Sequence, residues 1–86
     1  MNIYVVTVLE ETQDGNYAYT CEKCSDTLEG AKKILKEVTE GFVKDYKENL
    51  GFDCEVTLFP TMSEITVNTD LEFVKLEIGE IELEEE

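Results

Sequence analysis

The stretch DTLEGAKKILKEVTEGFVKDYKENLG, residues 26–51, decides the fold. Its spacing of apolar residues, in steps of three and four, places them on one face of an α-helix with charged residues opposite. Asp26 and Glu29 have the spacing of a capping box, which predicts Asp26 as the N-cap, and Gly51 is typical of a helix end. The apolar face comprises Leu28, Ala31, Ile34, Leu35, Val38, Phe42, Val43, Tyr46 and Leu50.

Two strands are predicted before this helix. Residues 2–9 are rich in β-branched and aromatic side chains and are apolar on both faces, which is typical of an interior strand. Gln13 to Asn16 is a strong turn signal. Residues 16–22 then form the second strand of a hairpin, with Tyr17, Tyr19 and Cys21 on one face.

After the helix the apolar period changes to two, which predicts three more strands. Residues 54–59 alternate, 60–63 form a turn, Ile65 and Val67 alternate again, and 68–70 form another turn. The last strand, about 71–83, changes its apolar parity across Gly79, which predicts a β-bulge there. The result is a single α+β domain, 1–86, of order ββαβββ. One amphipathic helix packs on a mostly antiparallel five-stranded sheet, in which the fifth strand pairs with the first.

Charge is the strongest functional signal. The chain has 21 Asp and Glu, 7 Lys, no Arg and no His, for a net charge of −14. Residues 52–86 hold 11 acids and one lysine, Lys75. Such a field repels nucleic acid and anionic membranes and attracts basic protein surfaces.

Enzymatic motifs are absent from the sequence. There is no His, no Gly-rich phosphate loop, and neither serine lies in a nucleophile motif. Cys21 and Cys24 form one Cys-x-x-Cys pair and Cys54 stands apart, which is a poor set for zinc. We expect Cys21 to pack as a small hydrophobe and Cys24 to lie in the connection to the helix. We therefore expect no enzyme activity, no metal and no cofactor.

Carboxylates of the C-terminal half are the candidate partner-binding residues. Alternate residues of a strand stand about 6.6 Å apart on one face, so a row of outward acids resembles a run of backbone phosphates. With the bulge, Glu77, Glu80, Glu82 and Glu84 are expected to form such a row. The alternative is a solvated face that serves solubility. The full candidate set is Asp53, Glu55, Glu64, Asp70, Glu72, Glu77, Glu80, Glu82 and Glu84.

In its size, pI of about 4.1, α+β pattern and clustered carboxylates, the chain resembles small acidic anti-defence proteins of bacteriophages and mobile elements. These include anti-CRISPR and antirestriction proteins, some of which mimic DNA. The resemblance implies an inhibitor of the basic nucleic-acid-binding surface of a defence protein, acting in the cytoplasm of a bacterial host. Its opening Ile-Tyr-Val-Val-Thr and the helix start Asp-Thr-Leu-Glu also resemble small proteins of low-GC bacteria, which implies fold more than function.

The second hypothesis is an interaction module or homodimer whose acidity serves only solubility. It rests on aromatic and apolar residues, Tyr4, Tyr17, Tyr19, Phe59 and Phe73, in a sheet that one helix cannot cover on both sides. The N-terminus lacks a basic region and a long apolar run, which favours a cytoplasmic protein over a secreted or membrane-spanning one.

Overall fold

In the computed structural model, which describes residues 1–12, 14–68 and 72–83, five strands and one helical segment follow the predicted order. The strands are β1 (Asn2–Thr12), β2 (Tyr17–Ser25), β3 (Cys54–Phe59), β4 (Met62–Val67) and β5 (Glu72–Glu82). The helix α1 (Leu28–Lys44) continues into a π-helical turn, η1 (Asp45–Asn49). The α+β class and the ββαβββ order are confirmed.

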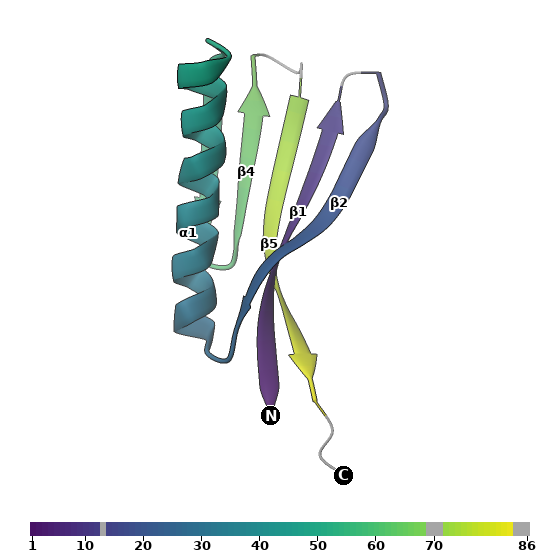
Figure 1. Cartoon of the computed structure of the whole chain (residues 1–86), viewed down its shortest axis with the longest axis vertical. Coiled ribbons are helices and arrows are strands. Elements are labelled where there is room, and N and C mark those ends of the chain that lie inside the picture. Colours follow the sequence, from purple (N-terminus) through teal and green to yellow (C-terminus); the bar gives the residue numbers. More distant parts are fainter. Residues whose placement is uncertain (13, 69–71, 84–86) are drawn as a thin grey trace.

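The sheet has the strand order β2-β1-β5-β4-β3, and every neighbouring pair is antiparallel (Figure 1). The predicted hairpin of β1 and β2 and the pairing of β1 with β5 are both confirmed. β1 and β5 pair over eleven residues each, from Asn2 opposite Glu82 to Thr12 opposite Glu72. The apolar character of β1 on both faces fits its position between two strands.

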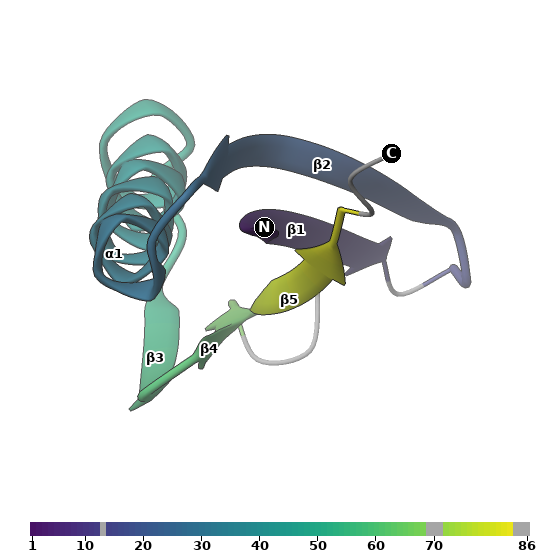
Figure 2. The ribbon, with the colours of Figure 1, turned by 90° about the horizontal axis from the view of Figure 1, so that it is seen from below.

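Helix α1 packs on one side of the curved sheet and leaves the other side uncovered (Figure 2). The covered side is called the helix face. Its buried residues join those of the helix in one small core: Val6, Val8, Ala31, Leu35, Tyr46, Ile65, Val67, Val74 and Leu76. Inside this core, Thr39 donates to the carbonyl of Leu35 at 2.7 Å and its hydroxyl lies 2.7 Å from the Ser63 hydroxyl. This contact satisfies both buried hydroxyls and ties α1 to β4.

The predicted N-cap is wrong by one residue. Thr27, in an extended conformation, is the N-cap, and its side chain accepts from the backbone N–H of Gly30 at 3.0 Å. The Ser25 hydroxyl in turn accepts from the Thr27 N–H. A Cβ at position 30 would lie 2.2 Å from the Ser25 Oγ, so any larger residue there would displace the Ser25 hydroxyl from its bond to the Thr27 N–H.

The end of the helix also differs from the prediction. The last turn, η1, widens to π-helical geometry, which keeps Tyr46 buried and turns Leu50 away from the apolar face to 53% exposure. Gly51 then adopts φ +69°, the left-handed conformation expected of the residue that ends a helix.

The predicted β-bulge at Gly79 is wrong. The pairing of β5 with β1 passes through Gly79 without a shift, so Ile81 keeps the parity of Glu77 and is 50% exposed. The register shift of the hairpin lies instead between Val6 and Thr7 of β1, where β2 holds an extra residue, Glu22. β2 continues past this shift to Ser25, beyond its predicted end at residue 22.

Candidate functional site

The uncovered side of the sheet, called the open face, holds the alternate residues of all five strands. Strand pairing places Glu11 of β1, Glu55 of β3, Glu64 of β4, and Lys75 and Glu77 of β5 on it. Its apolar and aromatic members are Ile3, Val5, Leu9, Tyr17, Tyr19, Phe59, Met62, Phe73 and Ile81. Tyr17, Tyr19, Phe59 and Ile81 are between 46% and 74% exposed. The open face therefore combines accessible apolar surface with an excess of acids.

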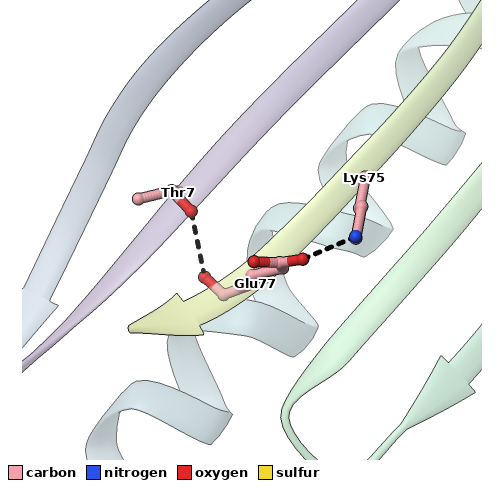
Figure 3. Close-up of polar contacts among 3 residues, drawn as sticks. All are labelled: Thr7, Lys75 and Glu77. Atoms are coloured by element: carbon pink, nitrogen blue, oxygen red, sulfur yellow. Dashed lines mark hydrogen bonds and ion pairs between the residues drawn. The ribbon is translucent and has the colours of Figure 1, made fainter. Parts of the chain in front are cut away.

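Lys75 is bracketed by acids on this face. Its Nζ lies 2.7 Å from the Glu77 Oε1 (Figure 3). Glu64 is its direct neighbour on β4. The hydrogen bond and charge of Glu77, with a further contribution from Glu64, raise the pKa of the Lys75 ammonium. Thr7 donates to the backbone carbonyl of Glu77 at 3.5 Å. The one cation of residues 52–86 is thus already neutralised within the molecule.

The predicted row of carboxylates along β5 does not form, because it depended on the bulge. Glu77 lies on the open face, whereas Glu80 and Glu82 point to the helix side. Asn2 pairs with Glu82, so the two side chains lie on the same side of the sheet. The side-chain amide of Asn2 donates a hydrogen bond to the Glu80 carboxylate, which places Glu80 on that side as well. Both acids are still exposed, because the lower ends of β1 and β5 extend past the first turn of α1 (Figure 1).

The other predicted site residues are divided among three places. Glu55 and Glu64 lie on the open face, Glu72 lies on the helix face, and Asp53 lies in the connection before β3. Asp70 and Glu84 lie outside the described residues. Of the nine candidates, the structure places Glu55, Glu64 and Glu77 on the open face and Glu72, Glu80 and Glu82 on the helix side.

Sequence reasoning missed Glu11, which belongs to the open face beside Phe73 and Tyr17. The first strand was predicted to end at residue 9, whereas β1 continues to Thr12. The turn signal at residues 13–16 could have placed Glu11, because a tight hairpin turn there implies that both strands continue as far as the turn.

A second acidic group lies on the helix face, near Tyr46. Partial burial, then the charges of Glu72 and Glu22, raise the pKa of Glu10 above its usual value. Burial, followed by hydrogen bonding to Glu72, likewise raises the pKa of the Tyr46 phenol. These shifts arise because the group faces the edge of the core, where carboxylates are less well solvated.

The charge of the chain is partitioned between its two layers. Residues 28–49, which form α1 and η1, contain five acids and five lysines and have no net charge. The rest of the sequence contains the other 16 acids and only two lysines, Lys23 and Lys75, so it accounts for all of the −14. The helix layer is neutral, and the sheet layer is strongly anionic.

Two of the three cysteines occupy accessible positions, and the third packs against the edge of the core. Cys21 and Cys24 are exposed, both within β2, and Cys54 is half-buried. The predictions that Cys21 packs as a hydrophobe and that Cys24 lies in the connection are therefore wrong, because β2 is an edge strand and extends to Ser25. Among the described residues, no three Cys, Asp or Glu side chains come close enough to hold a metal ion.

Comparison with known proteins gave no match to a family model, to a curated protein or to a solved structure. Within the described part of the chain, no helix has the length and apolar character needed to cross a bilayer.

Proposed function

We propose that this protein uses the open face of its sheet to bind the basic, nucleic-acid-binding surface of a larger protein and inhibits that protein. A defence protein such as a CRISPR effector or a restriction enzyme is the proposed target. The observation that carries the proposal is the charge distribution: the helix layer is neutral, whereas the open face of the sheet holds four acids, Glu11, Glu55, Glu64 and Glu77, against one lysine, Lys75.

Binding would have two components, electrostatic attraction by the carboxylates and apolar contact by the exposed side chains of the open face. Carboxylates Glu11, Glu55 and Glu64 would attract lysine and arginine side chains that normally contact phosphates, which raises the association rate and makes binding sensitive to salt. Tyr19, Phe59 and other exposed apolar groups of the open face would supply the desolvated contacts that hold a complex together. This differs from mimicry of phosphates by a single strand, because the acids lie around apolar surface and not in one row.

A competition experiment tests the proposal. Purified effectors of both classes are loaded with fluorescently labelled DNA or guide RNA, and this protein is titrated into each complex. The proposal expects displacement from at least one effector at micromolar concentration, with weaker competition as salt rises. Failure to displace nucleic acid from any member of the panel would overturn it.

The second candidate is a homodimer formed through the same open face. It is favoured by the apolar side chains of that face, among them Ile81 and Phe59, which the helix leaves uncovered. Two copies with a charge of −14 each repel one another, so a dimer should strengthen with salt, whereas binding to a basic partner should weaken. Light scattering across protein concentration, at low and high salt, separates the two candidates.

A further inference from the structure

A groove of about 400 Å³ lies between helix α1 and the edge strand β3. Most of its exposed surface is apolar, and its aliphatic residues are Val43 of α1 with Val56 and Leu58 of β3. The volume falls within the range of roughly 300–1,000 Å³ that is typical of small-molecule sites. We call it the lysine groove, because three of the seven lysines, Lys36, Lys44 and Lys47, also line it.

The groove exists because the helix does not reach the edge of the sheet. β3 is the last strand in the order β2-β1-β5-β4-β3, and it lies to one side of α1 (Figure 2). Val56 and Leu58 share the helix face with buried residues of β4, yet they are 41% and 68% exposed. This apolar surface therefore belongs to the accessible groove and not to the core.

Charge distinguishes this groove from the rest of the molecule. Within the described residues, Lys36, Lys44 and Lys47 form no ion pair. Lys75, by contrast, pairs with Glu77. The acids Glu40 and Glu48 also line the groove, but the lysines outnumber them. On the opposite flank of α1, the groove against β2 has only the acids Glu22 and Asp45 as its charged residues. The groove lining thus has a net charge of +1, on a chain whose net charge is −14.

We propose that the lysine groove binds a free fatty acid with an alkyl chain of about twelve carbons. Its alkyl chain packs against Val43, Val56 and Leu58, and its carboxylate contacts the lysine ammonium groups at the rim. Lysine is suited to this arrangement, since its aliphatic stem adds apolar surface while its ammonium group remains in water. The proposal is independent of the function proposed for the open face, because it uses the other side of the molecule.

Laurate, kept below its micelle-forming concentration, is the probe. It is titrated into ¹⁵N-labelled protein and followed by NMR. Saturable, one-to-one shifts are expected for the amides of Val43, Val56 and Leu58. Octanoate should bind about tenfold or more weakly, because each methylene buried contributes to affinity. Dodecyltrimethylammonium, which has the same chain length and a cationic head, should not shift these amides selectively.

Matched variants distinguish binding by the groove residues from a general effect of the protein's net charge on laurate. K44E/K47E should weaken laurate binding by about tenfold or more, since two groove cations become anions. K23E/K33E changes the net charge equally at residues that do not line the groove, and it should leave the affinity within about twofold. L58S should weaken binding, whereas L50S, at another exposed leucine, should not.

Three results would overturn the proposal. The first is the absence of saturable shifts in the groove, and the second is an equal loss of affinity in both double-lysine variants. The third is a shift of the groove amides on diluting the protein alone, which would assign the groove to a second copy of the chain.

Discussion

The Lys75 ammonium lies 2.7 Å from the Glu77 carboxylate at the centre of the open face. Because Lys75 is the one lysine after residue 47, this ion pair cancels the only positive charge that residues 52–86 supply. What the open face presents to a partner is therefore apolar surface with the uncompensated acids Glu11, Glu55 and Glu64 around it.

Removing Lys75 should strengthen binding to a cationic partner. In Lys75→Gln, Glu77 loses its counter-ion and adds its charge to the open face. We expect tighter binding of a synthetic oligolysine and a steeper loss of binding with salt, measured by fluorescence anisotropy. Lys33→Gln removes the same charge from the exposed side of α1 and should produce a smaller gain. Equal gains would show that net charge alone controls binding.

The helix cap gives a direct stability test. Thr27→Ala removes the acceptor for the Gly30 N–H and should lower the free energy of unfolding by about 1 kcal/mol in urea titrations. Asp26→Ala should cost clearly less, since the Asp26 side chain makes no capping contact to the described residues. A larger loss from Asp26→Ala than from Thr27→Ala would restore the capping box predicted from sequence.

The two helix glycines should respond in opposite ways to alanine. At Gly41 an alanine methyl group would meet no atom within 4 Å beyond the helix's own backbone, so Gly41→Ala should stabilise the protein by up to about 1 kcal/mol. At Gly30 the methyl group would collide with the Ser25 hydroxyl, so Gly30→Ala should lose that gain or destabilise the protein. Thermal unfolding of both variants measures the difference, and equal stabilisation would contradict the cap geometry.

Glu10 should make stability depend on pH. Its pKa is raised in the folded state by burial and by Glu72 and Glu22, so the folded protein binds its proton more tightly than the unfolded chain does. The Glu10 contribution to stability therefore increases as pH falls through the raised pKa and is unfavourable at neutral pH. Glu10→Gln should raise the urea midpoint at pH 7 and show a smaller gain than wild type on acidification to about pH 5. An identical gain in the two proteins would contradict the shift.

Local periodicity was sufficient to predict the helix, the hairpin and the pairing of β1 with β5. The parity change across Gly79 was misinterpreted because it has two physical explanations, a bulge or a strand that leaves the core. The structure has the second: β5 extends past the helix, so Ile81 needs no burial. The predicted carboxylate row failed with the bulge, since a change of one residue in register moves every later side chain to the other face.

The N-cap could not be chosen from sequence because Asp26 and Thr27 are both good capping residues. The choice depends on where the chain leaves the sheet, and that is set by the pairing of Ser25 with Tyr4 across the bulged hairpin. The lysine groove was likewise beyond a local pattern, because Leu58 and Lys44 are brought together only by the order of the strands.

We propose that the open face of the sheet, and not net charge alone, binds a basic nucleic-acid-binding surface. Two charge-reversal variants test it in the competition experiment, with circular dichroism to confirm the fold. E11K/E55K reverses two exposed acids of the open face, and E80K/E82K makes the same change in net charge at exposed acids of the helix side. We predict that E11K/E55K abolishes displacement of nucleic acid from the effector that wild type inhibits, while E80K/E82K retains most of it. Equal loss in both variants, or full activity of E11K/E55K, would contradict it.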